Sequence, residues 1–228
     1  RGGGFPNKST SAQGVVASPP PRAPANPEGL PATSTSVAVY WTDMPTNETG
    51  FRIERSVDGG ASWAPAGSSG ANEPQFTDRL VASEQLVCYR VIAFNGVGES
   101  LPSNADCTTP PAGPTDLTAT VNDDTSIDLA WTDNSAVEDG YEVWVDGGDG
   151  NSSAVASLPP NTTSFRLPAG WCGYCYWHYV VAIKDAGYSD FSNVWVAAIP
   201  PLAGASSVRA SSTSRTAVAR LPAPRRAP

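Results

Sequence analysis

Short runs in which apolar and polar residues alternate, separated by Gly, Pro, Asn and Asp, fill the middle of the chain. One run brings Val37, Val39 and Trp41 to one side, and the next does so with Phe51 and Ile53. Because side chains alternate between the two faces of a strand, this period of two predicts antiparallel strands with one buried face. Apolar residues at helical spacing are almost absent, so the pattern predicts an all-β protein.

The strand pattern occurs twice. Residues 37–43 (VAVYWTD) return as 127–133 (IDLAWTD), and residues 48–53 (ETGFRI) return as 138–143 (EDGYEV), both at an offset of 90. Further on, Gly-Glu-Ser returns as Gly-Tyr-Ser at an offset of 89. This period is too long for the unit of a solenoid and predicts a duplicated domain of about 100 residues.

Three motifs recur in both copies: a tryptophan on the second strand, Gly-aromatic-x-aliphatic on the third, and an alternating strand that leads, in the first copy, to the loop 95–100 (NGVGES). Over about residues 28–199 they resemble the fibronectin type III family. The resemblance implies two tandem immunoglobulin-like β-sandwich domains, and it leaves the function open because this sandwich hosts many roles. The family usually has a tyrosine at the start of its sixth strand. Tyr176 fits that place, whereas the first copy has Val87 there.

The expected organisation has four parts. They are a basic N-terminal segment rich in Pro, Gly and Ser (1–27), fibronectin type III-like domain 1 (28–110), fibronectin type III-like domain 2 (111–199) and a basic C-terminal tail rich in Ser, Ala, Pro and Arg (200–228). The outer segments contain too few apolar residues to bury a core of their own. The proline-rich junction at 110–114 is short and should restrict the angle between the domains.

Charge is distributed unevenly. Of the 14 basic residues, eight lie in the two outer segments, which contain no acidic residue, so six remain in the body against 22 acidic ones. An acidic body repels phosphate, and nucleic acid is not expected as a partner. No apolar run is long enough to span a bilayer. The chain begins at Arg1 without a signal-peptide core, which suits a processed mature protein or a fragment.

The four cysteines form two candidate pairs. A hairpin that pairs residue 93 with residue 102 also brings Cys88 opposite Cys107, and a bridge there closes a loop of about 20 residues. Cys172 and Cys175 form a C-x-x-C motif, for which redox chemistry and half of a zinc site are the alternatives to a local disulfide. The disulfide is favoured because further ligands and a thioredoxin-like context are missing. Paired cysteines predict a secreted or cell-surface protein.

Residues suited to catalysis are scarce. His178 is the only histidine, and its place on an alternating strand predicts a core residue. There is no glycine-rich phosphate loop or nucleophile elbow, and the adjacent acids at 123–124 and 138–139 have turn-like contexts. We therefore expect no enzymatic activity, no cofactor and no metal site.

Three other motifs have simple interpretations. Residues 56–63 (SVDGGASW) resemble the Asp-box of sialidase-type propellers, a folded hairpin, and positions 58–59 also fit a two-residue turn. Residues 146–150 (DGGDG) lack the ligand spacing of a calcium loop, so a turn is expected. Four N-glycosylation sequons begin at Asn7, Asn47, Asn151 and Asn161.

The outward positions of the two copies differ. In domain 2, alternation places Trp144, Trp177, Tyr179 and Val181 on the outer face of a sheet, and Val196 belongs to the same face. The matching positions of domain 1 are mostly polar, and its cysteine pair stands where domain 2 has Trp177 and Val196. A contiguous apolar face marks an interface or a ligand surface, with local packing under a loop as the alternative.

Two functions fit these features. In the first, the chain is a non-enzymatic subunit of an extracellular or cell-surface assembly, a filament or adhesive fibre. It would pack through the domain 2 face and the basic tails onto itself or other extracellular proteins. In the second, it is a spacer or binding module of a larger secreted enzyme or adhesin, in which Trp144, Trp177 and Tyr179 stack on carbohydrate.

Overall fold

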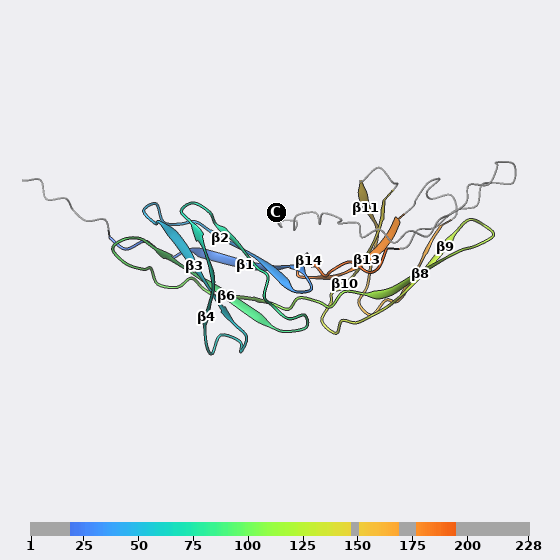
Figure 1. The fold of residues 1–228 in the computed structure, drawn as a ribbon, viewed down its shortest axis with the longest axis horizontal. Helices are drawn as coiled ribbons and strands as arrows, with labels where there is room; N and C mark the ends of the chain where they lie inside the picture. Colours follow the sequence, from blue (N-terminus) through green and yellow to red (C-terminus); the bar gives the residue numbers. More distant parts are fainter. Residues whose placement is uncertain (1–18, 147–150, 169–176, 195–228) are drawn as a thin grey trace, which may run out of the picture.

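The computed structural model describes residues 19–146, 151–168 and 177–194. In this part of the chain all regular structure is β, with 14 strands in four sheets. The strands form two sandwiches that follow one another along the long axis of the molecule (Figure 1). The predicted all-β class is confirmed.

Domain 1 packs a three-stranded sheet against a four-stranded sheet. The first has the order β1–β2–β5, with β1 (Ala25–Thr33), β2 (Ser36–Thr42) and β5 (Gln75–Asp78). The second has the order β4–β3–β6–β7, with β4 (Ala64–Gly70), β3 (Gly50–Ser56), β6 (Val87–Phe94) and β7 (Asp106–Thr108). Neighbouring strands pair antiparallel.

Domain 2 repeats this arrangement. Its three-stranded sheet has the order β8–β9–β12, with β8 (Thr115–Val121), β9 (Ile127–Thr132) and β12 (Ser164–Leu167). Its four-stranded sheet has the order β11–β10–β13–β14, with β11 (Ser152–Leu158), β10 (Gly140–Asp146), β13 (Trp177–Lys184) and β14 (Gly187–Tyr188). The repeat in the sequence is thus a repeat of the fold.

The fourth strand of each domain decides the type of sandwich. β4 pairs with β3 and β11 pairs with β10, so the fourth strand lies in the sheet of the third strand. In a constant-type immunoglobulin domain it lies instead with the first, second and fifth strands. The observed order is that of a fibronectin type III sandwich, as the sequence motifs predicted.

The predicted inward residues of domain 1 form its core. Val37, Val39, Phe51 and Ile53 are fully buried, and Trp41 packs edge-on against Phe51 with the ring centroids 5.2 Å apart. Burial of each large apolar side chain stabilises the fold by about 1.5–3 kcal/mol. The alternating runs therefore hold the two sheets together, and domain 2 has a corresponding cluster.

Domain 1 secures the start of β6 without the usual tyrosine. Val87 is buried in the core, and Tyr89, two residues further on, donates its hydroxyl to Asp78 Oδ2 (3.2 Å). Arg55 donates to the same oxygen (2.8 Å). Burial and then the Asp78 carboxylate raise the pKa of Tyr89. Tyr176, which we expected to hold this place in domain 2, lies outside the described residues.

Serine side chains complete the hydrogen bonding of the sixth strand. The backbone N–H groups of Val91 and Ala93 donate to the Oγ atoms of Ser103 and Ser100, each at 3.0 Å. The corresponding serines of domain 2 make the same bonds to β13. Backbone N–H groups in a sandwich need such partners, which explains why both copies contain a serine pair at this spacing.

Candidate functional site

The outer faces of the two four-stranded sheets differ at equivalent positions. In domain 1, Glu54 of β3 lies directly opposite Arg90 of β6. In domain 2, the same register places Trp144 of β10 opposite Tyr179 of β13. Directly opposed side chains contact one another, so an ion pair in one domain is replaced by an aromatic pair in the other.

An ion-pair network covers the domain 1 face. Arg90 donates to Glu54 (2.6 Å), and Arg52 bridges Glu54 and Glu99, with 2.7 Å to the latter. Burial raises the pKa of the Glu54 carboxyl, but the hydrogen bond from Arg90 and the charges of both arginines outweigh it and lower that pKa. The Arg90 guanidinium also lies 4.4 Å from the centroid of the Trp63 ring. This face is therefore polar and neutralised internally.

The Asp58 carboxylate holds together the loop between β3 and β4. The Asp58 carboxylate accepts hydrogen bonds from the Ser56 hydroxyl (2.6 Å) and from the N–H (2.9 Å) and hydroxyl (2.5 Å) of Ser62. These bonds lower the pKa of Asp58, the bond from Ser56 most. The loop spans residues 57–63, so the expected two-residue turn at 58–59 is wrong. The turn is wider because the hydrogen bonds of the Asp58 carboxylate reach from Ser56 to Ser62.

Cys88 and Cys107 form the expected disulfide. The two residues lie directly opposite each other on β6 and β7, with their Cα atoms 3.9 Å apart. The bond attaches the short strand β7 to the buried strand β6. Cys172 and Cys175 lie outside the described residues.

Four rings form an aromatic cluster on the outer side of domain 2: Trp144, Tyr179, Tyr188 and Phe191. The Trp144 and Tyr179 rings are stacked, with centroids 6.2 Å apart and planes at 9°. Phe191 packs edge-on against Tyr179 (4.6 Å), and Tyr188 against Trp144 (6.4 Å). The indole N–H of Trp144 donates to Glu142 (3.0 Å). Such ring pairs add about 0.5–1.5 kcal/mol each, so the cluster is a stable part of the sheet.

The outer positions are more buried than alternation alone predicts. Tyr179 is 5% exposed and Val181 is fully buried, whereas Trp144 and Trp177 are half-buried. The rings of Trp144 and its neighbours cover Tyr179. The expectation that Tyr179 and Val181 are accessible is therefore corrected, and the accessible part of the face is at the two tryptophans. Val196 lies outside the described residues.

Alternation does not identify Tyr188 and Phe191. Tyr188 stands at the position of Glu99 in the repeated loop, so the offset of 89 contains its signal. Phe191 follows β14, which has only two residues, and strand periodicity ends there. Its contact with Tyr179 depends on the path of the chain after β14.

Glu84 connects the two domains. Its carboxylate accepts hydrogen bonds from the Ser135 hydroxyl (2.9 Å) and the Ala136 N–H (2.9 Å) of domain 2. It also accepts from the N–H of Ala112 in the junction (2.7 Å), and the Glu84 N–H donates to Pro110 (2.8 Å). One side chain thus joins domain 1, the junction and domain 2. No sequence pattern had indicated this role.

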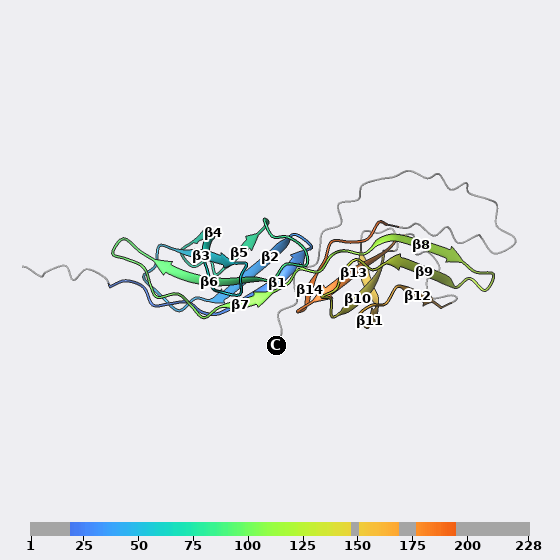
Figure 2. The ribbon, with the colours of Figure 1, turned by 90° about the horizontal axis from the view of Figure 1, so that it is seen from below.

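The other side of the interdomain contact involves β14, which lies beside β1 (Figure 2). The Thr108 hydroxyl donates to the carboxylate of Asp185 (2.8 Å). The N–H of Asp190 donates to the hydroxyl of Ser34 (3.0 Å). Hydrogen bonds on both sides of the junction restrict the angle between the domains, as the short proline-rich sequence suggested.

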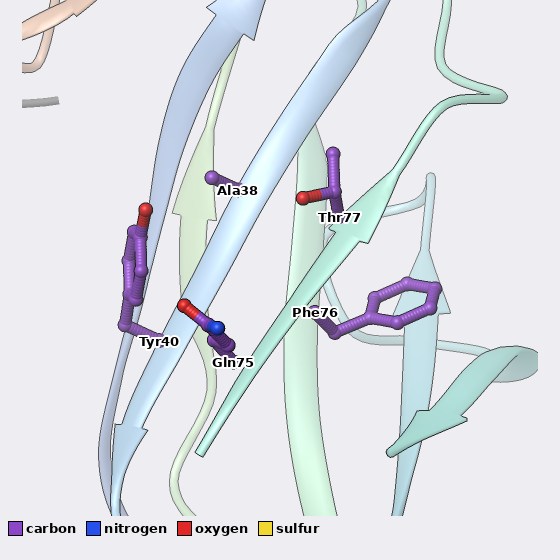
Figure 3. Close-up of a pocket in the computed structure, with 5 residues that line it drawn as sticks. All are labelled: Ala38, Tyr40, Gln75, Phe76 and Thr77. Atoms are coloured by element: carbon purple, nitrogen blue, oxygen red, sulfur yellow. The ribbon is translucent and has the colours of Figure 1, made fainter. Parts of the chain in front are cut away.

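A hollow of about 310 Å³ lies over β2 and β5 (Figure 3). It is lined by Ala38, Tyr40, Gln75, Phe76 and Thr77. Two of the pairs are directly opposed across the strands, Ala38 with Thr77 and Tyr40 with Gln75. The lining contains no acidic, basic or cysteine side chain.

The described residues contain no group of three or more His, Cys, Asp and Glu side chains arranged for a metal ion. Over the same ranges, no helix has the length and apolarity that crossing a membrane requires. His178 is fully buried on β13, as its strand position predicted.

No protein-family model matches the chain, and no curated protein matches it. Among solved structures, the FN1–FN3 domains of chicken CNTN1 (contactin) are 19% identical, with a TM-score of 0.47 over 77% of this chain and 66% of that one. A two-domain fibronectin type III segment of chicken tenascin is 16% identical, with a TM-score of 0.37 over 78% and 100%. The chain therefore spans just under two thirds of the contactin fragment. The strand order of its own sheets carries the assignment: the chain is a tandem pair of domains with the fibronectin type III fold.

Proposed function

We propose that this chain is a non-enzymatic structural and interaction protein that acts outside the cell, as a subunit of an extracellular or cell-surface assembly such as a filament or adhesive fibre. Domains of this fold are commonly extracellular structural or interaction modules. The Cys88–Cys107 disulfide is compatible with an oxidising compartment.

The single observation that carries the proposal is that equivalent positions on the two sheet faces hold an ion pair in domain 1 and an aromatic pair in domain 2. Domain 1 has Glu54 paired with Arg90, and domain 2 has Trp144 stacked on Tyr179. Both pairs cover the outer face of a sheet. Only the face with the aromatic pair leaves apolar surface, at Trp144 and Trp177, that a partner can bury. Tryptophan and tyrosine are the residues that contribute most binding energy in protein interfaces.

The interdomain contact supports a structural role. Hydrogen bonds from Ser135 and Ala136 to Glu84, and from Thr108 to Asp185, hold the two sandwiches end to end. A two-domain unit held in this way presents the domain 2 face in one orientation relative to domain 1. Repeated contacts between such units generate a regular fibre rather than a random aggregate.

The uneven distribution of charge supports assembly of the chain with itself or with another acidic protein. The body carries 22 acidic and six basic residues, and the outer segments carry eight basic residues and no acidic one. Basic segments of one molecule attract the acidic body of the next, and salt weakens that attraction. The partner is another copy of the chain or another acidic extracellular protein.

Carbohydrate binding is the second candidate. The half-buried rings of Trp144 and Trp177 lie on neighbouring strands, since Asp146 of β10 is opposite Trp177. Exposed aromatic rings can stack on the apolar faces of sugars. In that case the chain serves as a spacer or binding module of a larger secreted enzyme or adhesin.

Sedimentation velocity and negative-stain electron microscopy at low and moderate salt test the first proposal. The wild type is expected to form salt-sensitive oligomers or filaments that Trp144→Ser disrupts. Leu101→Ser is the matched control, because Leu101 is an apolar residue of domain 1 that is 80% exposed and lies outside the aromatic cluster.

Monomers under all conditions would overturn the assembly. Tryptophan fluorescence with a panel of soluble and insoluble glycans then decides the second candidate. A change that is lost in Trp144→Ser would support sugar binding, and an unchanged spectrum would rule it out.

A further inference from the structure

The same two buried polar atoms lack a hydrogen-bond partner in each domain. In domain 1 they are Trp41 Nε1 and Glu48 Oε2, and in domain 2 they are Trp131 Nε1 and Glu138 Oε2. All four residues are less than a tenth exposed. Buried polar groups are almost always hydrogen-bonded, so a repeated exception at positions 90 residues apart points to a shared ligand.

The pairs have the same surroundings. In domain 1 the loop between β4 and β5 contacts both residues: the Asn72 N–H donates to Glu48 Oε1 (3.3 Å), and the Trp41 N–H donates to the carbonyl of Pro74 (3.2 Å). In domain 2 the loop between β11 and β12 makes the corresponding bonds to Glu138 (3.0 Å) and Trp131 (3.0 Å). Each loop therefore closes over one tryptophan and one glutamate.

A third group differs between the domains. Asp133 of domain 2 accepts hydrogen bonds from the Tyr141 hydroxyl and from the N–H of Ser135 (3.0 Å). At the positions equivalent to Tyr141 and Ser135, domain 1 has Phe51, which lacks the hydroxyl, and Pro45, which lacks the backbone N–H. Asp43 Oδ1 is buried without a partner in the described part of the chain.

Asp43 lies near the other two groups. Asp43 follows Thr42, the last residue of β2, and is two residues from Trp41 in the chain. Burial, followed by the charge of Glu48, raises the pKa of Asp43. Among the described residues, domain 1 thus has one indole N–H and two carboxylate oxygens that are buried without a partner, and domain 2 has one of each.

This combination selects the chemistry of the ligand. A metal ion would satisfy the carboxylates but cannot accept the tryptophan N–H, and a simple anion would be repelled by the carboxylates. Water can both accept and donate two hydrogen bonds, so it can accept from the indole N–H while donating to carboxylate oxygens, and buried waters typically make about three hydrogen bonds. We propose that one buried water in each domain bridges the tryptophan indole to the glutamate, and that the domain 1 water also donates to Asp43.

NMR spectra of the intact chain test this proposal. Of the seven tryptophan indole N–H signals, those of Trp41 and Trp131, assigned through Trp41→Phe and Trp131→Phe, are expected to show cross-peaks to a long-lived water. The absence of both cross-peaks would overturn the proposal. Because the assignment variants need only fold well enough for a spectrum and the measurement uses the wild type, the result does not depend on a damaged core.

A crystal structure at about 1.5 Å provides the second test. A solvent peak about 2.7–3.2 Å from each indole nitrogen and glutamate oxygen supports the water. A direct indole–carboxylate bond, or a peak about 2.3–2.6 Å from the carboxylate oxygens that requires calcium, would overturn it. Phe51→Tyr introduces the hydroxyl of domain 2 and is expected to lower the pKa of Asp43 and to retain the indole–water cross-peak.

Discussion

The hydroxyl of Ser135 in domain 2 donates a hydrogen bond to the carboxylate of Glu84 in domain 1 at 2.9 Å. The same carboxylate accepts two backbone N–H groups, from Ala112 and Ala136. Hydrogen bonds to a charged group contribute about 1.5–3 kcal/mol, less where the group is partly exposed. Glu84 therefore links domain 1, the junction and domain 2 through three hydrogen bonds.

Glu84→Ala is expected to loosen the junction and leave each domain folded, because the side chain contributes to neither core. Residual dipolar couplings should no longer fit one common orientation for both domains, and coupling between their unfolding should fall by about 1–3 kcal/mol. Gln85→Ala is the matched control, since Gln85 is an exposed neighbour. Unchanged couplings in Glu84→Ala would show that other contacts set the angle.

Gly187→Ala is expected to disturb the same junction by steric means. A Cβ at Gly187 would lie 2.3 Å from the carbonyl oxygen of Pro31, which is backbone and cannot turn aside. The equivalent Gly98 of domain 1 has only the Pro20 side chain near it, at 3.4 Å. Small-angle scattering should detect a changed shape for Gly187→Ala and the wild-type shape for Gly98→Ala. Equal profiles for both variants would contradict the close contact.

Removal of the disulfide is expected to destabilise domain 1 alone. Cys88 and Cys107 are separated by 19 residues, and a loop of that size constrains the unfolded chain by about 3 kcal/mol in the loop-entropy model. Urea unfolding of the double variant Cys88→Ala/Cys107→Ala should shift the domain 1 transition by that amount. A shift below about 1 kcal/mol, or an equal shift in domain 2, would count against it.

Glu54 is expected to make domain 1 sensitive to acid. Its pKa is lowered from 4.5 because the arginine bonds outweigh burial. Its contribution to stability is therefore present above about pH 4.5 and is lost as the pH falls through the lower folded-state pKa. Glu54→Gln should reduce stability at pH 7 by about 1–3 kcal/mol and flatten the acid side of the stability–pH curve. Glu99→Gln, at a half-exposed site, should cost less than about 1 kcal/mol, and an identical pH curve for Glu54→Gln would disprove this role.

Local periodicity explains why much of the fold could be predicted. The inward positions of Val37, Val39 and Trp41 follow from the period of two, and the opposition of Cys88 and Cys107 follows from one hairpin register. Both depend on residues near one another in the chain or paired by a single turn. The repeat at 90 residues then extends the prediction from one domain to the other.

Exposure and interdomain contact were decided by the tertiary structure. Alternation placed Tyr179 on the outer face correctly, but the stacked ring of Trp144 and the edge of Phe191 bury it. Which face a side chain points to is a local property, whereas its accessibility depends on which other segments of the chain cover that face.

By itself, the sequence determined the fold class, the duplication, the core positions and the pairing of Cys88 with Cys107, because strand period and hairpin register are short-range. The contact of Glu84 with Ser135, 51 residues further on, was decided only when two folded domains met. Such contacts depend on the shapes of two completed surfaces, and no period in the chain encodes them.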